Sequence, residues 1–222
     1  MNELQGTSIS NYEKPDKLVF FLHGYGSNAE DMISLSTFWN FNIKINFFAP
    51  NAPFNHPEHF NGYQWFDIYP NGVPYNMAGE KENKIMENEC KISTKKIESY
   101  ILNLCKIHSV NLQDCFIIGF SQGAMIAYEL GLYIKKKLAG CIMISGRVLS
   151  DKSIEKNTFT KTPLMILHGD KDDIITPNYF VEATKIAKSN GFEVEDHLIV
   201  GEGHAISQNM LKLIQNFVEK NV

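Results

Sequence analysis

Short, uninterrupted apolar runs alternate with helical patterns along this chain of 222 residues, and the alternation limits the folds open to it. Runs of this kind are typical of strands that are buried on both faces of a sheet. Strands are expected at residues 17–22, 45–49, 115–120, 138–145, 164–168 and 192–200, and helices at 29–38, 80–108, 122–135, 177–189 and 206–219. A chain that alternates strands with helices forms a mainly parallel sheet with helices on both faces, so the sequence predicts an α/β fold.

Two connecting segments differ from ordinary loops. Residues 50–79 contain five of the chain's eight prolines together with seven aromatic side chains. A loop of this length is usually functional or disordered, and the aromatic side chains favour an ordered wall beside a site. Residues 146–162 are short and polar, which predicts an open site without a large lid domain. Because no internal repeat or linker interrupts the pattern, one domain is expected over residues 1–222.

Charge and composition argue against several classes of partner. The 21 basic and 25 acidic residues give a net charge of -4, so no strong positive field is available to bind nucleic acid. The N-terminal residues lack the basic and apolar regions of a secretory signal, and no apolar run approaches the length of about 20 residues that a membrane span needs. We therefore expect a cytoplasmic protein with no integral membrane association. Its four cysteines are expected to be reduced core thiols.

The pentapeptide Gly119-Phe120-Ser121-Gln122-Gly123 fits the pattern G-x-S-x-G. An apolar strand pattern precedes it and a helical pattern follows it, which is the strand, sharp turn and helix of a nucleophile elbow. Glycines at positions 119 and 123 would let the strand and the helix approach closely. The context therefore predicts Ser121 as a nucleophile rather than as a simple helix cap.

A nucleophilic serine needs a base, and the base needs a third group to orient it. In folds with a nucleophile elbow, the partners follow in the order serine, then aspartate or glutamate, then histidine. His204 lies in a glycine-rich turn after the last expected strand, which predicts that it is the base. The expected strand at 164–168 leads into Asp170, Asp172 and Asp173, and these residues by themselves do not show which carboxylate is the acid.

The segment His56-Pro57-Glu58-His59 contains two histidines close together, but it does not predict a metal site. It lacks the H-E-x-x-H spacing that places two histidines on one helical face, and Pro57 disfavours a regular helix. No metal is therefore expected.

Taken together, these motifs resemble the phospholipase/carboxylesterase family of the α/β-hydrolase superfamily, which includes bacterial carboxylesterases and acyl-protein thioesterases. The similarity extends in order through most of the chain. It is found in Phe21-Leu22-His23-Gly24-Tyr25-Gly26, Pro50-Asn51-Ala52-Pro53, Gln64-Trp65-Phe66-Asp67, Gly119-Phe120-Ser121-Gln122-Gly123, His168-Gly169 with Asp172, and Gly203-His204. The resemblance implies an α/β-hydrolase fold and a serine hydrolase that cleaves carboxylic esters or thioesters without a cofactor.

The resemblance also implies roles for individual residues. Ser121 would be the nucleophile, His204 the base and Asp172 the acid, since the family's acid is the fifth residue counted from the histidine of the His-Gly pair. The backbone N–H groups of Tyr25 and Gln122 would form the oxyanion hole. Tyr25 stands where many members have a smaller or aliphatic side chain, so the shape of the acyl pocket does not transfer from the family.

The resemblance implies a small acyl ester or thioester as substrate, with a lysophospholipid or an acylated protein as further options. The clustering of Phe60, Tyr63, Trp65 and Phe66 suggests that these rings contact the acyl chain, and the alternative is that they only pack the proline-rich loop against the body of the domain. Two alternative functions remain, a peptidase-like hydrolase on the same fold and a catalytically silent binding module. The oligomeric state is open, and a homodimer is one of the options.

Overall fold

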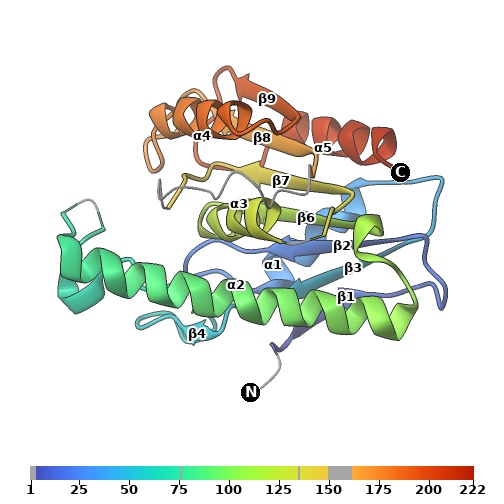
Figure 1. Cartoon of the computed structure of the whole chain (residues 1–222), viewed down its shortest axis with the longest axis horizontal. Coiled ribbons are helices and arrows are strands. Elements are labelled where there is room, and N and C mark those ends of the chain that lie inside the picture. Colours follow the sequence, from blue (N-terminus) through green and yellow to red (C-terminus); the bar gives the residue numbers. More distant parts are fainter. Residues whose placement is uncertain (1–3, 76, 135, 150–161) are drawn as a thin grey trace.

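A sheet of seven strands forms the centre of the computed structural model, which describes residues 4–75, 77–134, 136–149 and 162–222 (Figure 1). The strand order is β1-β3-β2-β6-β7-β8-β9. Only β1 runs antiparallel to its neighbour β3, and all the other neighbouring strands are parallel. The strands comprise β1 Gly6–Ile9, β2 Lys17–Leu22, β3 Ile45–Pro50, β6 Cys115–Phe120, β7 Gly140–Ile144, β8 Leu164–Gly169 and β9 Val194–Ile199.

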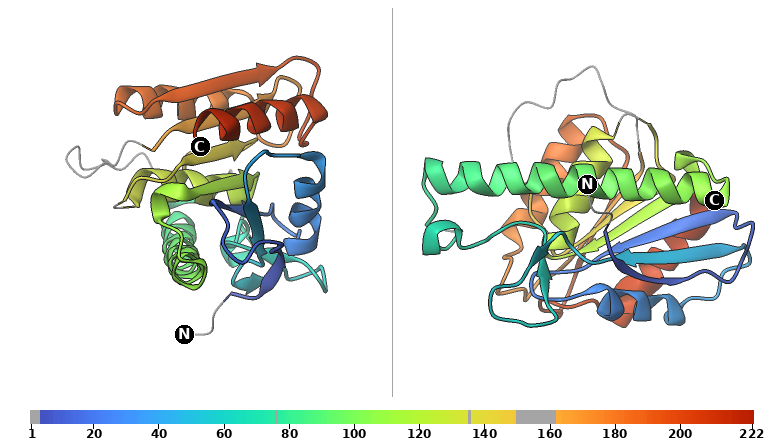
Figure 2. Two further views of the ribbon diagram at one scale, coloured as in Figure 1. Left: turned by 90° about the vertical axis from the view of Figure 1, so that its right-hand side faces the viewer. Right: turned by 90° about the horizontal axis from the view of Figure 1, so that it is seen from below.

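Helices cover both faces of this sheet (Figure 2). Helices α2 Glu80–His108, α3 Gln122–Tyr133 and α4 Asn178–Ser189 contribute to one hydrophobic cluster, and α1 Ala29–Ile33 and α5 Gln208–Lys220 contribute to the other. Alternate side chains of β2 enter the two clusters, with Phe20 on the first side and Phe21 on the second. This is the pattern of a strand buried on both faces. The prediction of a mainly parallel α/β sheet with helices on both faces is confirmed.

Two elements differ from the sequence-based expectations. Strand β1 was not expected, because Gly6-Thr7-Ser8-Ile9 contains only one large apolar residue and no apolar run. It joins the sheet through backbone pairing with β3. The helix expected over residues 29–38 ends as an α-helix at Ile33 and continues as a 3₁₀ helix over Ser34–Phe38. The hydroxyl groups of Ser34, Ser36 and Thr37 each donate to the carbonyl three residues earlier. Such local bonds compete with regular α-helical geometry.

The segment at 50–79 is ordered where it is described, which excludes residue 76. It contains a small hairpin of β4 Phe54–Asn55 and β5 Tyr63–Gln64, followed by a 3₁₀ turn at Pro70–Gly72. Within the described chain no large lid covers the sheet, and most of the expected lid position, residues 150–161, lies outside the described residues. None of the described helices is long and apolar enough to cross a bilayer.

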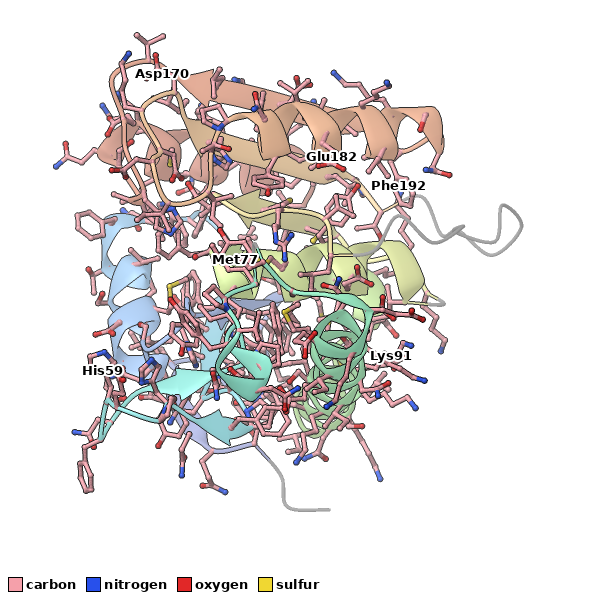
Figure 3. The ribbon with its side chains drawn as sticks, turned by 90° about the vertical axis from the view of Figure 1, so that its left-hand side faces the viewer. His59, Met77, Lys91, Asp170, Glu182 and Phe192 are labelled. Atoms are coloured by element: carbon pink, nitrogen blue, oxygen red, sulfur yellow. The ribbon has the colours of Figure 1, made fainter. Side chains whose placement is uncertain are left out.

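Strands β6, β7, β8 and β9 are parallel neighbours, so their carboxyl ends lie at one edge of the sheet. Figure 3 faces this edge, where the loop after β8, marked by Asp170, lies on the same side as the 50–79 segment, marked by His59 and Met77. Ser121 follows β6, Asp172 follows β8 and His204 follows β9. Loops at the carboxyl ends of parallel strands are where α/β proteins bind their ligands.

Candidate active site

Ser121 occupies a sharp turn between β6 and α3. Its φ of 53° and ψ of -116° lie in a region that side-chain-bearing residues rarely adopt. Close packing around the turn requires glycine on both sides. A Cβ at Gly119 would lie 2.2 Å from the carbonyl oxygen of Gly123, and a Cβ at Gly123 would lie 2.1 Å from that of Leu22. The local geometry is that of a nucleophile elbow.

His204 links Ser121 to Asp172. Its Nε2 lies 3.0 Å from Ser121 Oγ, and its Nδ1 lies 2.8 Å from Asp172 Oδ2. Both are hydrogen-bonding distances, and the second contact orients the imidazole so that its other nitrogen can accept the serine proton. The structure thus brings together the three side chains that the sequence singled out, although they are 32 to 83 residues apart along the chain.

The carboxylate of Asp172 is buried, and both of its oxygens have partners. Oδ1 accepts the backbone N–H groups of Ile174 and Ile175 at 3.0 and 2.8 Å, while Oδ2 contacts His204. Burial by itself would raise the pKa of Asp172, but the hydrogen bonds from His204 and Ile175 outweigh it and hold the pKa below its usual range. Asp172 is therefore a carboxylate that can stabilise a positively charged imidazole.

The two neighbouring aspartates have other surroundings. Asp170 Oδ1 accepts the backbone N–H of Gly201 at 2.6 Å, which ties the loop after β8 to the turn that carries His204. Asp173 is exposed to solvent. Of the three carboxylates that the sequence left open, only Asp172 contacts His204 within the described chain.

A cavity of about 330 Å³ opens beside Ser121. Its walls include Tyr25 and Gln122, and within the described chain neither of their backbone N–H groups donates to a backbone carbonyl. These two N–H groups therefore have no backbone acceptor among the described residues and border the cavity beside Ser121. The cavity is lined by Gly24, Tyr25, Ser27, Phe66, Ile68, Tyr75, Phe120, Ser121, Gln122, Met125, Arg147, Ile174, Ile175 and His204.

The side chain of Gln122 holds the 50–79 segment against the nucleophile elbow. Its Oε1 accepts the N–H of Trp65 at 2.8 Å, and its Nε2 donates to the carbonyl of Phe66 at 2.7 Å. The indole N–H of Trp65 in turn donates to the carbonyl of His23 at 2.8 Å, just before the Gly24-Tyr25 turn. The Trp-Phe pair therefore connects the Gly24-Tyr25 turn to the residue that follows Ser121.

His23 anchors the start of the same turn. Its Nδ1–H donates to the carbonyl of Gly24 at 2.7 Å, and its Nε2 accepts the N–H of Ala52 at 3.0 Å. Burial lowers the pKa of His23 to about 4, so the ring is neutral near pH 7 and serves as one donor and one acceptor. It contributes to the position of the Gly24-Tyr25 turn without lining the cavity.

Of the four aromatic residues predicted to contact the acyl chain, only Phe66 lines the cavity. Trp65 is fully buried behind the wall, and Tyr63 lies in β5, where its backbone pairs with Gly26 and Ser27. Phe60 is fully exposed at the tip of the hairpin. The interpretation of the aromatic cluster as a substrate wall is therefore corrected for three residues, because their side chains or backbones support the loop or face solvent.

Sequence reasoning missed three residues around the site. His168 Nε2 lies 3.3 Å from Asp172 Oδ2, and the ring of His56 packs edge-on against Tyr25 at 4.5 Å between centroids. Arg147 lines the cavity. The His-Gly pair at 168–169 was a sequence signal for His168, whereas no local pattern pointed to His56 or Arg147.

Among the described residues, no group of three or more histidine, cysteine or acidic side chains could hold a metal ion.

Comparisons with known proteins agree with this geometry. The family model for phospholipase/carboxylesterase matches residues 6–222. The acyl-protein thioesterase 1 of Candida albicans is 28% identical over 91% of this chain and 92% of its own length, and the carboxylesterase SOBER1 of Arabidopsis thaliana is 26% identical over 92% and 90%. The crystal structure of esterase PE8 superposes with a TM-score of 0.88 at 27% identity, covering 100% of both chains. The chain belongs to the phospholipase/carboxylesterase family, and it is a carboxylic ester hydrolase of the α/β-hydrolase fold.

Proposed function

We propose that this protein hydrolyses carboxylic esters or thioesters through an acyl-enzyme on Ser121. The observation that carries the proposal is the position of the His204 imidazole, which contacts Ser121 Oγ on one side and Asp172 Oδ2 on the other. Ser121 is the nucleophile, His204 the general base and Asp172 the group that selects the imidazole tautomer. Tyr25 and Gln122 supply the backbone N–H groups of the oxyanion hole.

The reaction proceeds in two steps, acylation of Ser121 and hydrolysis of the acyl-enzyme. In the first, Ser121 Oγ attacks the carbonyl carbon while its proton passes to His204 Nε2, and the negative charge on the carbonyl oxygen is stabilised by the N–H groups of Tyr25 and Gln122. His204 then protonates the departing alcohol or thiol, which leaves the acyl group on Ser121. In the second step, water gives a proton to His204 Nε2 and attacks the acyl carbon. His204 then returns that proton to Ser121 Oγ as the acyl–oxygen bond breaks, which releases the carboxylic acid and restores both residues.

The acyl group lies in the cavity against apolar side chains, which supports short to medium acyl chains as substrates. The wall formed by Phe66, Ile68 and Met125 is apolar, and each methylene fully removed from water contributes about 0.8 kcal/mol. A cavity of about 330 Å³ sets an upper limit on how many methylenes are buried. A thioester on an acylated protein is one version of this substrate and a lysophospholipid is another, and the acyl-protein thioesterases among the relatives support the first.

We also propose that residues 1–222 act as a single catalytic domain in the cytoplasm. The four cysteines are all buried and unpaired, which is typical of a reducing compartment.

The test uses the purified full chain, a fluorophosphonate probe and neutral ester substrates. The protein is expected to be labelled once, on Ser121, and Ser121→Ala is expected to lose hydrolysis by on the order of 10⁶-fold while remaining folded. Asp173→Asn serves as a control that is expected to retain activity, because Asp173 is exposed to solvent and does not contact His204 in the described structure. Labelling at another residue, or full activity of Ser121→Ala, would contradict the proposal. A silent binding module would remain unlabelled, whereas a peptidase would be labelled and would cleave peptide bonds in addition to esters.

A further inference from the structure

Arg147 is the only arginine in the sequence, and it lines the cavity beside Ser121. Its side chain is half-buried in a wall that consists mostly of apolar residues. Among the described lining residues it is the only lysine, arginine, aspartate or glutamate, so it alone places a permanent charge in the wall. A permanent positive charge in this position therefore calls for an explanation beyond the hydrolysis of a neutral ester.

The guanidinium group has no carboxylate partner in the described part of the chain. It lies over two aromatic rings instead, with its central carbon 4.9 Å from the centroid of Tyr75 and 5.8 Å from that of Tyr179. Such contacts hold the plane of the guanidinium while its five N–H donors remain free. A held guanidinium without a partner is suited to bind a carboxylate or a phosphate in bidentate fashion.

Arg147 is close enough to Ser121 for both to contact one small substrate. Strands β6 and β7 are paired up to Phe120 and Ile144, and the N–H of Ser121 donates to the carbonyl of Ile144 at 2.9 Å. The next residues in the two strands therefore lie side by side, and Arg147 follows two positions after Ser145. Both residues also border the same cavity.

We propose that Arg147 binds an anionic group of the substrate, so that the preferred substrate is an ester or thioester that carries a carboxylate or phosphate a few bonds from the scissile carbonyl. This inference rests on the hydrolase function proposed above and narrows its substrate class. The apolar wall strengthens the interaction, because a charge pair is screened less where water is partly excluded. Aliphatic parts of the substrate contact the apolar wall, and the anionic group contacts Arg147.

The anionic group can belong to either side of the ester, and the substrates are chosen to distinguish the possibilities. One set comprises half-esters of dicarboxylic acids, in which the acyl side carries the carboxylate. A second set comprises esters of hydroxy acids, and a third comprises acylated glycerol phosphate, in which the leaving group carries the carboxylate or phosphate. Each anionic substrate is compared with a neutral analogue of similar size.

Three variants are compared with the wild type in steady-state kinetics. Arg147→Gln removes the charge but keeps a polar side chain, and Arg147→Lys keeps the charge but loses the planar fork. Lys185→Gln is the matched control, because Lys185 is exposed on α4 and does not line the cavity. It removes one positive charge from the field of the molecule without altering the site.

For at least one anionic series, Arg147→Gln is expected to lower kcat/KM by about 10- to 100-fold, while the neutral analogue changes by about threefold or less. Arg147→Lys is expected to retain part of the preference, and Lys185→Gln all of it. The inference is overturned if Arg147→Gln lowers kcat/KM equally for anionic and neutral substrates. That result would mean that Arg147 only packs between the tyrosines. It is also overturned if the wild type prefers no anionic substrate. Failure of the hydrolase function itself is distinguishable, because neutral esters would then not be cleaved either.

Discussion

His168 is a fully buried residue whose ring faces the same carboxylate oxygen as His204. Its Nε2 lies 2.6 Å from the carbonyl of Ile175 and 3.3 Å from Asp172 Oδ2. Both partners are acceptors, so Nε2 carries the proton. Burial lowers the pKa of His168, which keeps the ring neutral. We interpret His168 as a positioning residue that donates a shared hydrogen bond to Asp172.

The first prediction follows from this contact. His168→Leu removes a donor from the Asp172 carboxylate, which then stabilises protonated His204 more strongly. The pH at which kcat/KM falls on the acid side is expected to move upward by a few tenths of a unit to about one unit. His168→Gln retains an N–H donor in a similar position and is expected to restore the profile. A profile with less activity but an unmoved midpoint in His168→Leu would indicate a purely structural role.

At the scale of elements, two adjacent aromatic residues of the 50–79 segment have different surroundings. Phe66 lines the cavity, whereas Trp65 is buried and donates its indole N–H to His23. Two adjacent rings on one segment therefore have separable functions, and acyl-chain kinetics can distinguish them.

The second prediction compares substitutions at these two positions. Trp65→Phe removes the indole hydrogen bond that holds the turn before Tyr25, so kcat/KM is expected to fall by a similar factor for every acyl length. Phe66→Ala removes apolar surface from the cavity, so its loss is expected to grow with each methylene that the wild type buries. Steady-state kinetics over an acyl series checks both. A length-dependent loss in Trp65→Phe would return Trp65 to the role of a substrate contact.

The contact between α2 and α3 contains a carboxyl group that is mostly withdrawn from water. Burial raises the pKa of Glu129 on α3 to about 7, with Lys91 of α2 opposing the rise and Glu87 of α2 adding to it. Because the folded state holds this proton more tightly than the unfolded state, the stabilising contribution is present below the ordinary pKa of 4.5 and is lost as the pH rises to about 7. Above that pH, the buried carboxyl group is charged and destabilises the folded state.

The third prediction tests this cost. Glu129→Gln is expected to raise the free energy of unfolding by about 1 to 3 kcal/mol at pH 8.5 relative to the wild type, and by much less at pH 5. Urea unfolding at the two pH values measures the difference. Glu182→Gln on the outer surface of α4, labelled in Figure 3, is the control and is expected to show little change at either pH. Equal stabilisation by Glu129→Gln at both pH values would contradict the assignment.

At the scale of the whole molecule, the four cysteines report on opening of the core. Cys90, Cys105, Cys115 and Cys141 come from α2, β6 and β7, and all belong to the cluster between the sheet and helices α2, α3 and α4. Each is at most 7% exposed. Burial raises the pKa of Cys90 and Cys141 to about 12, which further disfavours the reactive thiolate.

The fourth prediction concerns these thiols. In the native protein all four are expected to react with a disulfide reagent far more slowly than a free thiol, and all four are expected to react at once when denaturant unfolds the core. Absorbance of the released chromophore, measured alongside circular dichroism, checks whether the two transitions coincide. A thiol that reacts rapidly without denaturant would show that this part of the core opens locally.

Much of the fold could be predicted because its signals are local. The apolar runs gave β2 and β6 with their observed bounds, and the helical pattern of α2 ended where the helix ends, at His108. The nucleophile elbow was also predictable, since strand, turn and helix are consecutive and the close approach at Gly119 and Gly123 demands residues without a side chain. Strand β1 was not predicted from the sequence, because it contains no apolar run and is held in the sheet by pairing with β3, which is distant in sequence.

The sequence by itself therefore determined the α/β layering and the identity of Ser121, because periodicity, glycine and turn chemistry act over a few neighbouring residues. The family resemblance pointed to Asp172, and the structure places it against His204, whereas only the tertiary structure decided which aromatic ring faces the cavity and that Arg147 borders it. Those outcomes depend on how loops from separate strands meet at one edge of the sheet. The packing of the whole domain sets which side chains meet at such an edge. Residues that are adjacent in sequence do not specify these contacts.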